Sequence, residues 1–135
     1  MKREFTLSQV VTLTRELAKL RNKCLPVKLG YALGRNLAIL SREADIVEEQ
    51  RRKLCERYAR KDENGFPSIV NGIYDMSKEH EIMCNNEFSE LLATTTMLDG
   101  IMQIPVSSIE AVDNGDRYDT LTMAELDVIC EFLEG

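Results

Sequence analysis

The fold is decided by residues 33–58, which read LGRNLAILSREADIVEEQRRKLCERY. Along this stretch, positions at alternating steps of four and three are apolar with one exception, which is the spacing of a heptad seam. No proline interrupts the run from residue 27 to residue 60, so we expect a single helix there. The seam positions are Leu33, Leu37, Leu40, Ala44, Val47, Arg51, Leu54 and Tyr58.

This helix is too long for the domain that contains it. Some 33 residues rise about 50 Å, whereas a compact chain of 135 residues has a diameter of roughly 37 Å. A capping box at Thr6 opens an expected first helix over residues 7–22, which covers only half of the rod. The other half needs cover from the C-terminal region or from another subunit. We therefore predict a homo-oligomer, with Val47, Arg51, Leu54 and Tyr58 as its seam.

Turn and capping signals divide the rest of the chain. Asn71-Gly72 between two apolar runs predicts a β-hairpin, because both central residues of a type I′ turn need a positive φ. Ser77 caps an expected helix over residues 78–93, which we expect to bury Ile82, Phe88, Leu91 and Leu92. Residues 94–104 read as a strand interrupted at Asp99-Gly100. A second capping box at Thr122 opens a last helix, which we expect to bury Leu126, Ile129, Cys130 and Leu133.

The sequence therefore predicts one α+β domain over residues 1–135. It consists of an N-terminal antiparallel helical hairpin with one long helix, a small antiparallel sheet, a helix between strands and a C-terminal helix. The sheet is expected to combine the Asn-Gly hairpin with a further strand.

The net charge of −6 conceals two unlike halves. Residues 1–62 carry 15 basic and 8 acidic side chains, giving +7, whereas residues 63–135 carry 2 and 15, giving −13. We therefore describe residues 1–62 as a basic helical hairpin and residues 63–135 as an acidic α+β part. Such asymmetry bears on partners and assembly rather than on the fold.

No apolar run approaches the length of a membrane span, and no signal-peptide core follows Met1. The four cysteines, Cys24, Cys55, Cys84 and Cys130, form no C-x-x-C pair, and isolated cysteines of this kind usually act as small buried apolar groups. We expect a cytoplasmic protein that does not engage membranes.

Three segments carry a family resemblance: LPVKLGYALGRNL at 25–37, ERYARKDENG at 56–65 and LTMAEL at 121–126. In these segments the chain resembles a group of small uncharacterised proteins encoded by phages and prophages of Gram-positive bacteria. The resemblance implies an origin and a fold, with the host bacterial cytoplasm as the location. It attaches no functional residue to any position.

No catalytic constellation stands out. His80 and Cys84 share a helix face and suggest half of a metal site, but no second pair of ligands is visible. No phosphate-binding loop, nucleophile elbow or H-E-x-x-H motif is present. We expect a protein that is not an enzyme and uses neither a metal nor a cofactor.

Basic residues crowd the distal half of the long helix. The candidate ligand- or partner-binding residues are Arg51, Arg52, Arg57, Arg60 and Lys61. Interleaved Glu48, Glu49 and Glu56 favour a solvated, salt-bridged helix instead, and the net charge makes duplex nucleic acid an unfavourable partner. Arg51 lies on the seam, where it either fixes the register and the oligomeric state or extends to solvent.

Three functions fit these observations. The first is a non-enzymatic phage accessory protein that binds and inhibits or redirects a host protein, as an anti-defence factor would. The second is a homo-oligomer that sequesters a nucleotide signal with Arg51, Arg52 and Arg57. The third is a virion or assembly component.

Overall fold

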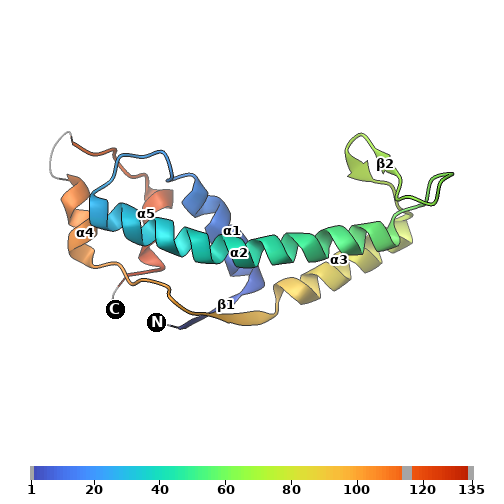
Figure 1. Ribbon diagram of the computed structural model, residues 1–135, viewed down its shortest axis with the longest axis horizontal. Coiled ribbons are helices and arrows are strands. Elements are labelled where there is room, and N and C mark those ends of the chain that lie inside the picture. Colours follow the sequence, from blue (N-terminus) through green and yellow to red (C-terminus); the bar gives the residue numbers. More distant parts are fainter. Residues whose placement is uncertain (1, 114–116, 134–135) are drawn as a thin grey trace.

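The computed structural model describes residues 2–113 and 117–133 and has an elongated shape (Figure 1). One helix, α2, runs through the whole molecule, with a globular body at one end and a slender projection at the other. The elements are β1 (Arg3–Thr6), α1 (Leu7–Ala18), α2 (Val27–Tyr58), β2 (Ile69–Val70), β3 (Ile73–Tyr74), α3 (Lys78–Leu92), β4 (Thr95–Leu98), α4 (Val106–Glu110), the 3₁₀ turn η1 (Ala111–Asp113) and α5 (Met123–Cys130).

The N-terminal helical hairpin is confirmed. The Thr6 hydroxyl accepts from the Gln9 backbone N–H at 3.1 Å, and the Gln9 side chain accepts from the Thr6 N–H at 2.9 Å, so the capping box forms as predicted. Helix α1 ends at Ala18 rather than at Asn22. The backbone beyond Ala18 tightens into three-residue turns, such as the bond from the Leu20 N–H to the Leu17 carbonyl at 3.0 Å.

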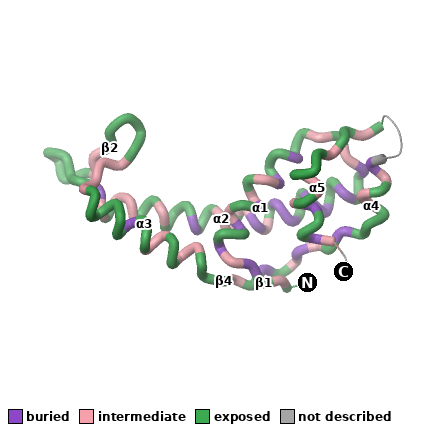
Figure 2. Tube along the Cα trace, turned by 180° about the vertical axis from the view of Figure 1, so that it is seen from behind, coloured by how far each residue is buried: buried purple, intermediate pink, exposed green. Residues whose placement is uncertain are grey.

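Helix α2 has 32 residues, so it is about 48 Å long. Its first half packs into the main core, where Leu33 and Leu40 are buried. Its second half packs against α3, and Val47 is only 3% exposed. The half of α2 that the first helix leaves uncovered thus packs against α3 of the same chain. Figure 2 shows most buried residues gathered at the body, with fewer along the projection.

The α+β class is confirmed, but the strands form two separate sheets. The Asn-Gly hairpin pairs β2 with β3 alone, and Asn71 and Gly72 both have positive φ, 53° and 79°. Strand β4 instead pairs with β1, which the sequence analysis missed because a single apolar residue, Phe5, lies among charged and polar neighbours. The expected strand over 94–104 ends at Leu98, since Gly100 at φ 89° turns the chain.

Two expected core residues prove to be exposed. Ile82 is 53% exposed because α3 packs against α2 on one face only, and Ile82 lies off that face. Cys130 is exposed because α5 turns Ile129 and the following Phe132, at 0% and 1% exposure, toward the core instead. Of the other residues expected to be buried in these helices, Phe88, Leu91, Leu92, Leu126 and Leu133 are half-buried.

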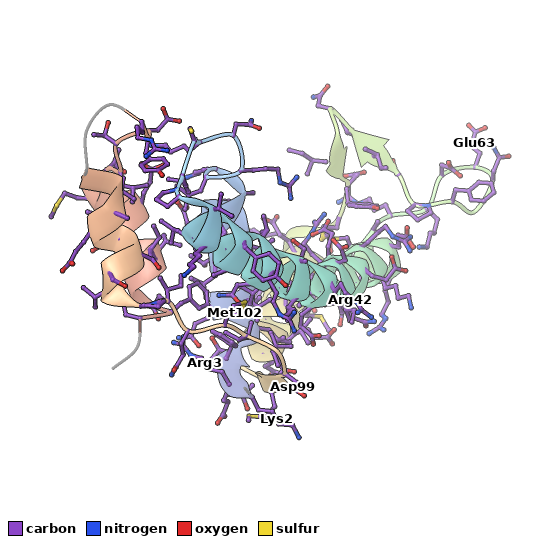
Figure 3. All side chains as sticks on the ribbon, turned by 60° about the vertical axis from the view of Figure 1, so that its left-hand side comes forward. Lys2, Arg3, Arg42, Glu63, Asp99 and Met102 are labelled. Carbon is purple, nitrogen blue, oxygen red and sulfur yellow. The ribbon has the colours of Figure 1, made fainter. Side chains whose placement is uncertain are left out.

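One buried amide fixes the body to α2. Asn36 is completely buried, and its Nδ2 donates to the Met102 carbonyl at 3.0 Å while its Oδ1 accepts from the Met102 N–H at 2.8 Å. The neighbouring Arg35 donates from Nε to the Gly100 carbonyl at 3.1 Å. Met102 and Arg3 lie on the same side of α2 (Figure 3). The segment after β4 is thus held to the helix by side chains that replace a strand partner.

We predict that Asn36→Ala lowers the free energy of unfolding by about 3 kcal/mol, because it leaves a buried N–H and a buried carbonyl without partners. Urea denaturation followed by circular dichroism measures the loss. Asn86→Ala, at an exposed position of α3, is the matched control and should change stability by no more than about 0.5 kcal/mol. Equal midpoints for the two variants would contradict the structural role of Asn36.

Candidate functional site

The slender projection at one end of α2 contributes no residue to the main hydrophobic core. We call it the arm, and it consists of residues 47–58 of α2, the β2–β3 hairpin with its flanking loops, and α3. No residue between Val47 and Cys84 belongs to the main core cluster. Figure 3 shows Glu63 at the far end of the arm, away from Met102 and Arg3.

The arm has a small interior of its own between α2 and α3. The Tyr58 hydroxyl donates to Glu87 Oε1 at 2.7 Å, and its ring lies 5.6 Å from the His80 ring, centroid to centroid. His80 and Glu87 are seven residues apart, so Tyr58 spans two turns of α3. Cys84 lies between them and is buried at 5% exposure. These contacts hold the end of α2 against α3.

Main-chain hydrogen bonds hold the hairpin to the end of α2. The Arg60 N–H donates to the Asp75 carbonyl and the Ser68 N–H to the Arg60 carbonyl, both at 2.7 Å. The loop before the hairpin is closed by Asp62, whose Oδ1 accepts from the N–H groups of Asn64 at 2.9 Å and Phe66 at 3.0 Å. The hairpin is therefore positioned by backbone atoms rather than by burial of its side chains.

The hairpin region turns its apolar side chains outward. We define the apolar tip as Phe66, Ile69, Val70 and Ile73, which are 66%, 57%, 54% and 72% exposed. Single exposed apolar residues are common on protein surfaces, but clusters of them mark interaction sites. Four such residues lie within eight positions of the sequence, and two of them, Val70 and Ile73, also line a cavity under the hairpin.

A cavity of about 580 Å³ lies under the hairpin, between it and the two helices. Val70, Ile73 and Tyr74 form part of its wall on the hairpin side, and Cys55 and Cys84 belong to its helical side. Charged groups also line it: Arg51 from α2, Asp75 after the hairpin and Glu81 from α3. The cavity is therefore mixed in character, with more carboxylates than cations.

Arg51 is the predicted candidate that lines this cavity. Its Nε and Nη2 donate to Glu48, the closest contact being 2.6 Å, and its Nη1 donates to the Cys55 sulfur at 3.7 Å. Hydrogen bonding to Glu48 raises the pKa of the Arg51 guanidinium, and the same contact lowers the pKa of Glu48. Arg51, the charged residue of the seam, thus forms an ion pair with Glu48 of the same helix and a hydrogen bond with the Cys55 sulfur.

The other four candidates do not converge on one site. Arg52 pairs with Glu49 and Glu56 at 2.5 and 2.6 Å on the exposed face of α2, as expected for a salt-bridged helix. Arg57 pairs with Glu87 at 3.6 Å. Arg60, 3.5 Å from Asp75, and Lys61, which donates to the Glu56 carbonyl, lie at the base of the hairpin.

Cys55 and Cys84 line one cavity, which was not predicted. They are 29 residues apart in the chain, and only the pairing of α2 with α3 brings both cysteines to the same cavity. Burial, followed by the nearby Cys55, raises the pKa of the Cys84 thiol. Cys55 directly follows the seam residue Leu54, and this position beside the seam was a partial indication that Cys55 lies near a second helix.

Two further searches concern the described residues only. None of the helices in residues 2–113 and 117–133 is long and apolar enough to cross a membrane. Within the same residues, no three or more His, Cys, Asp or Glu side chains are grouped as metal ligands. Comparison with family models, curated proteins and solved structures found no match for this chain.

We predict that Tyr58→Phe lowers the urea midpoint at pH 8, and that this difference from the parent protein disappears in strong alkali. The hydrogen bond to Glu87 raises the pKa of Tyr58, so the folded protein holds the phenolic proton more tightly than the unfolded chain does. The stabilisation is therefore complete below the ordinary pKa and is lost as the pH rises through the folded pKa.

Tyr31→Phe is the matched control, because Tyr31 is 60% exposed and lies on the first half of α2. It should leave the midpoint unchanged at both pH values. A loss in Tyr58→Phe that stays constant with pH would show that packing, and not the phenolic proton, accounts for it.

Proposed function

We propose that this protein is a non-enzymatic binding protein and that its partner protein contacts the apolar tip of the arm. The exposure of Phe66, Ile69, Val70 and Ile73 is the observation that carries the proposal. Each strand of the hairpin has only two residues, and an isolated two-stranded hairpin is marginal in water. Apolar side chains that support neither the core nor a larger sheet are available for contact with a partner.

The surroundings of the tip also resemble those of a protein interface. Binding surfaces typically place an apolar centre inside a polar rim. Here Arg60 pairs with Asp75 at the base of the hairpin, and the loop before the hairpin carries Lys61, Asp62 and Glu63, so charges of both signs border the tip. Two of the sequence-derived candidates, Arg60 and Lys61, thus become rim residues in this proposal.

The resemblance to phage and prophage proteins supplies the class of partner. We propose a protein of the bacterial host, bound in the host cytoplasm, which the phage protein inhibits or redirects. An anti-defence role is the form of this proposal that the sequence analysis favours. A rigid arm that presents a small apolar tip suits insertion into a pocket on a folded protein.

Nucleotide sequestration is the second candidate function, and it draws on Arg51 in the cavity. Glu48 already occupies two of the guanidinium nitrogens, and Asp75 and Glu81 line the same cavity. An incoming phosphate would therefore meet two carboxylates and a neutralised cation. The geometry gives this function less support than it gives to binding at the tip.

We predict that the double variant Ile69→Ser/Ile73→Ser weakens partner binding by about 30-fold or more, the effect of losing a central apolar anchor. A photo-crosslinking residue at position 73, expressed in a Gram-positive host, identifies the partner. Calorimetry with the purified partner then measures the affinity. Both isoleucines are exposed, so the melting temperature should stay close to that of the parent.

Ile46→Ser is the matched control, because Ile46 is 56% exposed on the shaft of α2 and away from the tip. It should bind like the parent, and crosslinks from position 46 should not recover the same partner. Equal affinities for the tip variant and the shaft variant would overturn the proposal.

Self-association through the tip is a separate proposal. It differs from the seam predicted from the sequence, Val47, Arg51, Leu54 and Tyr58, because α3 of the same chain packs against that half of α2. Light scattering at tens of micromolar should then show an oligomer that Ile69→Ser/Ile73→Ser dissociates. A monomeric parent protein at that concentration would contradict homo-oligomerisation while leaving the proposal of a host partner intact.

A further inference from the structure

Cys55 of α2 and Cys84 of α3 line the same cavity, and Cys55 is close enough to be one of the causes that raise the pKa of Cys84. Tyr58 contacts both His80 and Glu87, which sets the register of α2 against α3 and places Cys84 opposite the turn before Tyr58. Cys55 occupies that turn, three residues before Tyr58 on the same face. Both cysteines line the cavity beneath the hairpin, and both are free thiols.

The two thiols differ in a way that suits an ordered reaction. Cys55 is half-buried and receives the Arg51 Nη1 hydrogen bond at 3.7 Å, whereas Cys84 is 5% exposed. Glu48 holds Nε and Nη2 of the same guanidinium, which leaves Nη1 directed at the sulfur. Arg51 therefore holds the sulfur of Cys55, the more exposed of the two thiols, beside the cavity.

We propose that Cys55 and Cys84 form a peroxide-sensitive dithiol pair that closes reversibly into a disulfide between α2 and α3. Cys55 reacts first, Cys84 resolves the intermediate, and Arg51 positions Cys55. This inference concerns the interior of the arm and does not depend on what contacts the tip.

The reaction balances with hydrogen peroxide as the oxidant. The Cys55 sulfur attacks one peroxide oxygen, so an S–O bond forms and the O–O bond breaks, and the departing hydroxide takes the thiol proton to become water. The Cys84 sulfur then attacks the Cys55 sulfenic acid. An S–S bond forms, the S–O bond breaks, and the second hydroxide leaves as water with the Cys84 proton. Two thiols are oxidised by two electrons, and one peroxide is reduced to two waters.

The bridge would act on the element that carries the tip. The residues between Cys55 and Cys84 include the whole hairpin, so a disulfide closes them into one loop anchored on both helices. Disulfides in cytosolic proteins are usually transient and sense redox state. Oxidation would therefore link α2 covalently to α3 beneath the hairpin, and a thiol reductant would break that link.

The test uses the full-length chain with Cys24→Ser and Cys130→Ser, because those two cysteines are exposed and would add side reactions. Treatment with a small molar excess of hydrogen peroxide should remove two hydrogen atoms from the intact mass. Peptide mapping should then recover a Cys55–Cys84 linked pair, which dithiothreitol cleaves. The melting temperature should rise by about 10 °C on oxidation, because the bridge closes a loop of about 30 residues.

Arg51→Gln tests the positioning role, and Arg52→Gln is its matched control one residue away. The rate of bridge formation should fall about five-fold or more in Arg51→Gln and stay unchanged in Arg52→Gln. Equal rates in the two variants would overturn the role of Arg51. Sulfinic acid at either cysteine without a linked peptide, or bridges only between molecules, would overturn the dithiol pair itself.

Discussion

The structure depends on one constraint of length: an uninterrupted helix of 32 residues must bury an apolar seam that is longer than the body of the protein. A single core cannot cover it. The chain divides the task, so that α1 and the C-terminal elements bury the first half and α3 buries part of the second. This division explains why the molecule has a body and an arm. The body holds the main core, and the arm has only two helices with which to exclude water, which is why its interior consists of a few specific contacts around Tyr58 and Cys84.

Part of the uneven charge of the sequence is paired within the chain. Ion pairs join the basic half to the acidic half at the body, through Arg3 with Glu131 and Lys23 with Glu125, and at the arm, through Arg57 with Glu87 and Arg60 with Asp75. Most of these pairs are exposed and contribute little stability individually. Their placement matters more, because they hold together segments that are far apart in sequence. The basic cluster of α2 is also neutralised by its own glutamates, so the positive half offers less free charge than its composition indicates.

Local signals predicted most of the helices and the hairpin, and they failed where a partner lay far away in sequence. Both capping boxes, at Thr6 and Thr122, formed as expected, because each needs only three neighbouring residues. Strand β1 escaped notice because its pairing with β4 spans some 90 residues. Asn36 was recognisable in principle: it follows Leu33 by three and precedes Leu40 by four, and a polar residue on a buried stripe indicates a buried hydrogen bond. Of the candidate site residues, Arg51 lines the cavity under the hairpin. The apolar tip was not foreseen, since its isoleucines and valine read as ordinary strand residues.

The way the hairpin is fastened has a consequence for the evolution of the protein. Backbone atoms of Arg60, Ser68 and Asp75 carry its hydrogen bonds, and the turn requires only that residues 71 and 72 accept positive φ. Side chains at the remaining tip positions are thus free to change without disturbing the body. These exposed positions can therefore change one residue at a time, while the long helix keeps the hairpin at the same distance from the core. Such a separation lets the sequence of the tip diverge at little cost in folding.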